Sequence, residues 1–255
     1  MITNWMQKRW FKPAALLLFI AALWAAYAVY PQPPAEVNAY ILQAQSFLHG
    51  RISIPIYVHD AAIFNGRYYV IHPPFPAALL VPFVALGVPL DAEILCLSLA
   101  LALATLWLAW RIFRRLGCEP ERCLWLCAAF FFGTGYWFAA AFCEGVWYFA
   151  HLVAVACLFG ALHESLSRGR GWLAGLLLGC AFLSRQLSLY AGVFLAAALW
   201  CNPRHAGRTL PRLGHLVGLA AGFGLCFALY LFYNWARFGD MFDTGYDYLA
   251  LTSFL

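Results

Sequence analysis

The feature that most constrains the fold of this chain is a series of long apolar segments that contain few charged residues. Only 11% of the 255 residues are charged and 64% are hydrophobic, whereas a soluble domain carries roughly 25% charged residues. Because such a chain cannot cover a water-exposed surface with polar groups, we predict an all-α polytopic membrane protein.

The apolar segments predict a bundle of about seven transmembrane helices. Trp172–Trp200 is too long for one straight span. One span would also place the flanking arginines on opposite sides of the membrane, so we predict two short spans with a turn near Arg185. The predicted spans are Pro13–Tyr30, Glu93–Ile112, Cys123–Phe142, Val146–Leu162, the two within Trp172–Trp200, and His215–Phe232.

The distribution of basic residues predicts the orientation of the bundle. Lys8, Arg9 and Lys12 precede the first apolar segment, and most of the arginines fall in alternate loops. Because loops rich in Lys and Arg stay in the cytoplasm, we place the N-terminus there, and a first outer loop (31–90) and a tail (233–255) on the outer face. Topology also explains the net charge of +5, so we expect no nucleic-acid partner.

The first outer loop, residues 31–90, carries three local signals. In Glu36–Leu48, apolar residues at helical spacing with polar residues opposite predict a helix lying on the membrane surface. Asn65-Gly66 predicts a hairpin turn. Phe75–Leu90 is apolar but divided by prolines into pieces too short to cross a membrane, so we predict a re-entrant or interfacial segment there.

The sequence gives no sign of a disulfide framework or a metal site. The nine cysteines form no CxxC pair, and several lie inside apolar segments, which is typical of small buried hydrophobic residues. The histidines have no ligand spacing, and no nucleotide-binding or hydrolase motif occurs. We therefore expect no metal and no bound cofactor.

Polar and ionisable residues collect in the segments that we assign to the outer face. Charged groups near the membrane are costly and so are candidates for function, although any single one can be a solvated loop residue or an interface anchor. Glu144 and Arg185 are flanked by apolar spans, which favours a function for both. The candidates are Glu36, His59, Asp60, Tyr68, Tyr69, His72, Glu144, Arg185, Tyr233, Asn234 and Arg237.

Four segments, taken in order, resemble the GT-C glycosyltransferases that use polyprenyl-phosphate sugars, of the protein O-mannosyltransferase and aminoarabinose transferase type (glycosyltransferase family 39). The segments are YILQAQSFLHG at Tyr40–Gly50, GRYY at Gly66–Tyr69 followed by Pro73-Pro74, RIFRRLG at Arg111–Gly117, and YNWARFGDMFDTGY at Tyr233–Tyr246. The resemblance covers nearly the whole chain. It implies a single GT-C-like domain over residues 1–255, equivalent to the N-terminal seven-span module of that fold, with a membrane-lying first outer loop.

The resemblance also implies roles for the candidate residues. Glu36 matches the family's first-loop acid, which is usually an Asp followed by a second acid, whereas Val37 follows here. Asp60 competes for that role, and Glu144 matches a second outer acid of some relatives. One of these carboxylates would accept the proton of an acceptor hydroxyl.

A cation must then stabilise the lipid phosphate that departs, and Arg185 or Arg237 would supply it. His59, Tyr68, Tyr69, His72, Tyr233 and Asn234 are expected to bind substrate. The expected partners are membrane lipid, a lipid-linked sugar donor and a glycan, lipid or protein acceptor. The resemblance places the protein in the inner (plasma) membrane with its active face toward the periplasm.

The alternative is a non-catalytic membrane scaffold, or a truncated and degenerate relative of the GT-C enzymes. The chain stops soon after the last predicted span, where full-length relatives usually continue. A transporter is disfavoured because the sequence shows neither internal repeats nor a pair of acids at the membrane midplane. Convergence of Glu36, Asp60, Glu144 and Arg185 on one cavity would favour the enzyme, and scattering of these residues would favour the scaffold.

Overall fold

The computed structural model describes residues 38–88, 90–142, 146–203 and 209–249, with isolated residues 18, 21 and 25; the side chains of 90–93, 209 and 211 are not described. The elements are α3 (Ala39–Leu48), β1 (Ala61–Phe64), β2 (Arg67–Val70), α4 (Phe75–Ala85), α5 (Leu90–Arg115), α6 (Pro120–Phe132), α7 (Tyr136–Ala141), α8 (Val146–Leu166), α9 (Gly171–Phe182), the 3-10 helix η1 (Gln186–Tyr190), α10 (Ala191–Trp200), α11 (Thr209–Phe238) and the 3-10 helix η3 (Tyr246–Tyr248). This part of the chain is mostly helical, as predicted.

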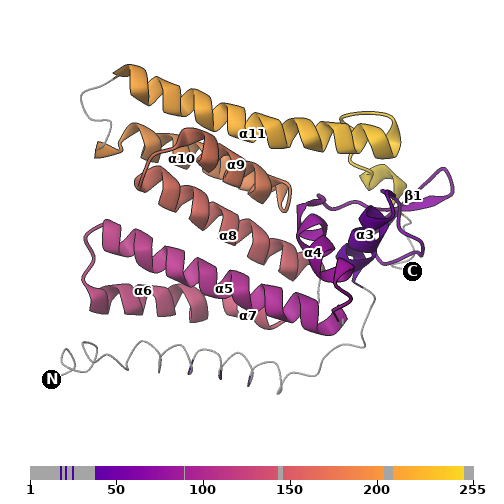
Figure 1. Cartoon of the computed structure of the whole chain (residues 1–255), viewed down its shortest axis with the longest axis horizontal. Coiled ribbons are helices and arrows are strands. Elements are labelled where there is room, and N and C mark those ends of the chain that lie inside the picture. Colours follow the sequence, from indigo (N-terminus) through magenta and orange to yellow (C-terminus); the bar gives the residue numbers. More distant parts are fainter. Residues whose placement is uncertain are drawn as a thin grey trace.

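The helices α5 to α11 run side by side, and the remaining elements gather at one end of them (Figure 1). The connections α5–α6 and α8–α9, the end of α10 and the start of α11 lie at the left end in Figure 1, which we call the basic end. The helices α3 and α4, the β1–β2 hairpin and the end of α11 lie at the right, which we call the loop end. The predicted alternation of loops between two ends is therefore present.

Three of the described helices are long and apolar enough to cross a membrane: Ile94–Arg115 in α5, Val146–Leu166 in α8 and Arg212–Phe238 in α11. These correspond to three of the predicted spans. Their surfaces suit a lipid environment, since large apolar side chains such as Val217, Leu225 and Phe232 of α11 are exposed. The described residues therefore fit a helical membrane protein.

The predicted count of seven spans is wrong for the described part of the chain. The segment Cys123–Phe142 forms two helices, α6 and α7, because α6 ends at Gly133 and a new helix begins after Gly135. The segment Trp172–Trp200 divides near Arg185, as predicted, but α9 and α10 have only 12 and 10 residues, against the roughly 20 that a span requires. The first predicted span, Pro13–Tyr30, lies outside the described residues.

The helices α9 and α11 approach closely through glycines. A Cβ atom added to Gly175 would lie 2.1 Å from the carbonyl oxygen of Leu219, and one added to Gly222 would lie 2.2 Å from that of Trp172. Gly171 and Gly179 continue the four-residue spacing along α9 and meet α11 as closely. Small residues at this spacing allow the close packing that holds helices together in membranes. The packing holds the end of α9 at Phe182, three residues before Arg185, against Tyr230 of α11.

The first outer loop forms a hairpin where the sequence predicts one. The strands β1 and β2 pair antiparallel with Ala61 opposite Val70. Asn65 and Gly66 form the turn with φ angles of 50° and 71°, the left-handed conformation that a two-residue hairpin turn requires. Gly50, with φ of 65°, follows the end of α3.

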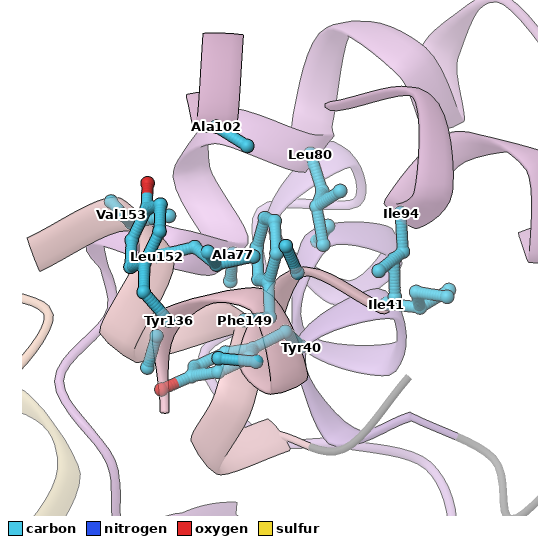
Figure 2. Packing of buried hydrophobic residues seen from close by; sticks show 14 of the residues in the cluster. Tyr40, Ile41, Ala77, Leu80, Ile94, Ala102, Tyr136, Phe149, Leu152 and Val153 are labelled. Atoms are coloured by element: carbon cyan, nitrogen blue, oxygen red, sulfur yellow. The ribbon is translucent and has the colours of Figure 1, made fainter. Parts of the chain in front are cut away.

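The helix predicted in Glu36–Leu48 is present as α3, but it is not a surface helix with an exposed polar face. Seven of its ten residues are buried, including Gln43 and Ser46. The reason is tertiary: α3 packs on α4 and on the ends of α5 and α8, and Tyr40 lies beside Phe149 with ring centroids 6.3 Å apart (Figure 2). Helical periodicity alone could not distinguish a lipid-facing apolar stripe from a buried one.

The Pro-rich segment forms α4, which has 11 residues. At about 1.5 Å per residue, a helix of this length reaches only about half-way across a hydrocarbon core of roughly 30 Å. Its residues Ala77 and Leu80 are fully buried in the same cluster as Tyr40 and Ile41 of α3 (Figure 2). The outer loop is therefore anchored to the bundle by its own hydrophobic core.

Candidate functional site

A single backbone hydrogen bond brings two distant segments together at the loop end. The N–H group of Phe75, the first residue of α4, donates to the carbonyl oxygen of Leu183 after α9, at 3.1 Å. His72 lies three residues before Phe75, and Arg185 lies two residues after Leu183. The bond therefore places the start of α4 next to the turn that carries Arg185.

Arg185, His72 and Trp147 are linked by hydrogen bonds. The Arg185 guanidinium donates from Nη2 to the carbonyl oxygen of Trp147 at 2.8 Å, and the Trp147 indole donates from Nε1 to His72 Nε2 at 3.2 Å. Tyr40 completes the group, with its ring centroid 6.3 Å from that of His72. We call these four residues, from α3, the loop before α4, α8 and the turn after α9, the Arg185 cluster.

His72 is neutral in this environment. Burial, together with the positive charge of Arg185, lowers its pKa to about 4, although Asp60 opposes the shift. The hydrogen bond agrees with this state, because an indole N–H can only donate and Nε2 must therefore be the acceptor. The neutral ring accordingly carries its proton on Nδ1.

Two donors of the Arg185 cluster are left without partners in the part of the chain that the structure describes. Both Arg185 Nε and the Tyr40 hydroxyl are buried and have no hydrogen-bond partner there. Burial raises the pKa of Tyr40, and Arg185 opposes the shift, so the hydroxyl stays protonated at neutral pH. Burial lowers the pKa of Arg185, but a guanidinium is charged at any ordinary pH. A cation and a neutral O–H donor therefore lie together, and that combination suits an anionic oxygen.

Arg237 also has a buried Nε atom without a partner among the described residues, but both of its terminal nitrogens are used in internal contacts. Its guanidinium donates to the carbonyl oxygen of Val70 and to Asn234 Oδ1, both at 2.6 Å. Its Cζ atom lies 4.2 Å from the centroid of the Tyr233 ring and 4.7 Å from that of Phe238. Only 3% of Arg237 is exposed. These contacts hold the hairpin on the end of α11, so the geometry favours a supporting role; a direct role in binding substrate stays a prediction.

Tyr233 and Asn234 both contact Arg237. We call these three residues the Arg237 cluster. Asn234 donates from Nδ2 to the carbonyl oxygen of Met241 at 3.1 Å, which ties the tail to α11. Gln43 of α3 donates to the Tyr233 hydroxyl at 2.5 Å. Because Gln43 and Tyr40 are three residues apart on α3, they lie on neighbouring positions of one face, and α3 connects the two clusters.

The remaining described candidates lie in or beside the hairpin. Asp60 has a left-handed φ of 62°, and its Oδ1 atom lies 3.3 Å from Nδ1 of the exposed His59. Tyr69 is buried against Phe238 with ring centroids 5.5 Å apart, whereas Tyr68 lines an open pocket of about 490 Å³. Asp60 acts electrostatically on His72, a member of the Arg185 cluster. Tyr68 and Tyr69 are both part of strand β2 of the hairpin.

Glu36 and Glu144 lie outside the described residues. Their predicted convergence with Asp60 and Arg185 therefore stays a prediction. Sequence reasoning missed three residues of the two clusters: Tyr40, Gln43 and Trp147. The available signal for Trp147 was its position three residues after Glu144, and for Gln43 it was a polar side chain within an apolar helical stripe.

Within the described ranges, no group of three His, Cys, Asp or Glu side chains is placed to hold a metal ion. Comparisons of the chain with protein-family models, with curated proteins and with solved structures find no match. A functional assignment therefore depends on the residues of the site themselves.

Proposed function

We propose that this protein is an integral-membrane glycosyltransferase that moves a sugar from a polyprenyl-phosphate donor to an acceptor hydroxyl at the outer face of the membrane. The observation that carries this proposal is the Arg185 cluster, in which Arg185 Nε and the Tyr40 hydroxyl are buried, close enough to interact electrostatically, and unpaired among the described residues. Such donors match the phosphate that leaves in this reaction.

The position of the cluster along the bundle supports the proposal. The helix ends and connections at the basic end carry Arg114, Arg115, Arg122, Arg168 and Arg170, and basic segments that flank membrane helices face the cytoplasm. The Arg185 cluster lies at the opposite, loop end, and therefore on the outer side. We accordingly place the protein in the inner (plasma) membrane with the N-terminus in the cytoplasm.

The short helices suit a substrate that enters from the lipid. We infer that α9 and α10 lie in the membrane as a pair of short helices, with the turn at Arg185 directed toward the outer side. The apolar helix α4 begins beside this turn through the Phe75–Leu183 hydrogen bond. A polyprenyl chain in the membrane can therefore lie against apolar surface while its phosphate meets Arg185.

The proposed reaction is a single displacement with inversion at the anomeric carbon. The acceptor oxygen forms a bond to that carbon as the bond from the carbon to the phosphate oxygen breaks. The acceptor proton passes to a carboxylate, for which Glu36, Asp60 and Glu144 are the candidates, and polyprenyl phosphate leaves with the bonding electrons. Arg185 stabilises the charge that develops on the phosphate, and neutral His72, buried beside it, adds no competing charge.

The carboxylate is tested with purified protein in proteoliposomes and a polyprenyl phosphate that carries a radiolabelled hexose or pentose. Glu36→Gln, Asp60→Asn and Glu144→Gln are compared with Asp247→Asn, a matched change in the exposed tail. We expect one of the three variants to lose transfer by a factor on the order of 100 or more, and Asp247→Asn to retain it. If all three variants transfer at the wild-type rate, the proposed carboxylate mechanism fails; if the folded wild-type protein transfers no sugar at all, the scaffold alternative is preferred.

A further inference from the structure

A second pocket, of about 560 Å³, lies at the basic end. It is formed by the last turns of α5 and α8 and by the connection between α8 and α9. We call it the basic pocket, and the lining residues that matter here are Trp107, Arg111, Arg115, His163, Arg168 and the Glu164–Arg170 pair. It lies at the opposite end of the bundle from the Arg185 cluster.

One arginine of the basic pocket is neutralised within the protein. Arg170 donates from Nε and Nη2 to the two carboxylate oxygens of Glu164, each at 2.9 Å, and its backbone N–H adds a third contact at 3.2 Å. Glu164 is the one acid among the residues that line the pocket, and this bidentate pair with Arg170 uses its charge.

Three other arginines keep an unbalanced charge. Among the described residues, the side chains of Arg111, Arg115 and Arg168 form no ion pair. Arg168 acts on Glu164 only through space, and Arg111 lies over the Trp107 ring. Arg111 and Arg115 are four residues apart on α5 and so share a face, and both act electrostatically on His163. Like charges gathered on one concave surface repel one another, and an anion bound between them removes that cost.

The surroundings of the basic pocket indicate where that anion comes from. The helices α5 and α8 are two of the three candidate spans, and both end at this pocket. Trp107 is 57% exposed at its edge, with the Arg111 Cζ atom 5.4 Å from its ring centroid, and exposed tryptophan is typical of the membrane interface. Basic pockets between membrane helices on the cytoplasmic side bind anionic headgroups.

We propose that the basic pocket binds the phosphate group of an anionic phospholipid from the adjacent leaflet. Arg111, Arg115 and Arg168 donate to the phosphate oxygens, and Trp107 lies at the level of the headgroups. The site holds the ends of α5 and α8 together at the membrane surface. It is independent of the reaction proposed at the loop end.

The test uses native mass spectrometry of the protein released from nanodiscs of phosphatidylcholine with or without phosphatidylglycerol. Arg115→Gln/Arg168→Gln removes two pocket charges, and Arg114→Gln/Arg122→Gln removes two charges from the same end outside the pocket. We expect binding of phosphatidylglycerol to weaken about 25-fold in the first variant, which corresponds to about fivefold per arginine, and to stay within about twofold of the wild type in the second. Equal losses in both variants, or a loss in neither, would overturn the site.

A measurement on the wild type covers the case in which the first variant does not fold. Modification of arginines by phenylglyoxal is followed by peptide mass spectrometry, with phosphatidylglycerol nanodiscs compared with phosphatidylcholine nanodiscs. We expect phosphatidylglycerol to protect Arg115 and Arg168 but not Arg122. Inorganic phosphate is the second ligand: if it protects the two arginines as well at equal concentration, the lipid assignment is wrong and the ligand is a soluble phosphate.

Discussion

Substitution of Gly175 by alanine is expected to destabilise the protein strongly for so small a change. The new Cβ atom would lie 2.1 Å from the carbonyl oxygen of Leu219, about 1.3 Å short of the 3.4 Å at which ordinary contact begins. The neighbour is backbone, so it cannot rotate away, and α9 and α11 must move apart. Overpacking of this kind costs about 1–3 kcal/mol, and the gain in helix propensity returns roughly 0.5–1 kcal/mol.

The overpacking cost should lie in the upper part of its range, because a separation of α9 from α11 at Gly175 also loosens the close contacts at Gly171, Gly179 and Gly222. We expect a net loss of about 2 kcal/mol, or a fall in Tm of about 5 °C. Thermal unfolding in detergent, followed by tryptophan fluorescence, measures this change.

Gly224→Ala is the matched control for Gly175→Ala. Gly224 lies on α11, the helix that packs against α9, but a Cβ atom added there meets nothing within 4 Å. The control gains helix propensity without a clash, so we expect its Tm to stay unchanged or to rise slightly. If Gly175→Ala is as stable as Gly224→Ala, the close packing of α9 on α11 is not what holds these helices together.

Three further predictions concern the loop end. Arg185→Gln should keep the fold but lower the rate of sugar transfer by about 100-fold or more, whereas Arg122→Gln should transfer normally; equal rates would exclude the proposed role of Arg185. Arg237→Gln should instead lower stability, by about 3 kcal/mol, because it removes two charged hydrogen bonds from a buried site; a Tm equal to that of Arg185→Gln would contradict this. The folded pKa of His72 is about 4 rather than 6.5, so the unfolded chain binds the extra proton and stability should fall by roughly 3 kcal/mol as the pH drops from 6.5 to 4. Chemical unfolding across this range should show the loss diminished in His72→Gln and retained in His59→Gln.

The parts of the fold that the sequence predicts depend on local signals. Asn65-Gly66 predicts its hairpin because few residues other than glycine and asparagine adopt the left-handed turn conformation. The helices α5, α8 and α11 follow from unbroken apolar length. The division of Trp172–Trp200 near Arg185 follows from the basic residues on either side of it.

The parts that the sequence does not predict depend on long-range contacts. The break at Gly133 is invisible to average hydropathy, because the residues on both sides of it are apolar. The burial of α3 depends on contacts with α4, α5 and α8. The glycines of α9 stand in the sequence at a regular spacing, but only the structure shows that they meet α11.

The features of the candidate site also separate into those that the sequence predicts and those that it does not. Charge and position at the outer face single out Arg185, Arg237 and His72 as polar groups in an apolar chain. They do not distinguish the two arginines, because the difference lies in the partners. The Nε atoms of both are unpaired among the described residues, but Val70 and Asn234 accept from both terminal nitrogens of Arg237, whereas the hydrogen bond of Arg185 uses only Nη2. Trp147 enters the site through its carbonyl oxygen and indole N–H, and no sequence motif specifies those contacts.

The most direct test of the proposed function is the release of polyprenyl phosphate by the purified wild-type protein in proteoliposomes. Donors that carry radiolabelled hexoses and pentoses are incubated with glycan, lipid and protein acceptors, and the lipid products are separated. We expect one donor to lose its label to an acceptor while an equal amount of polyprenyl phosphate appears. Folded protein that leaves every donor intact would contradict it.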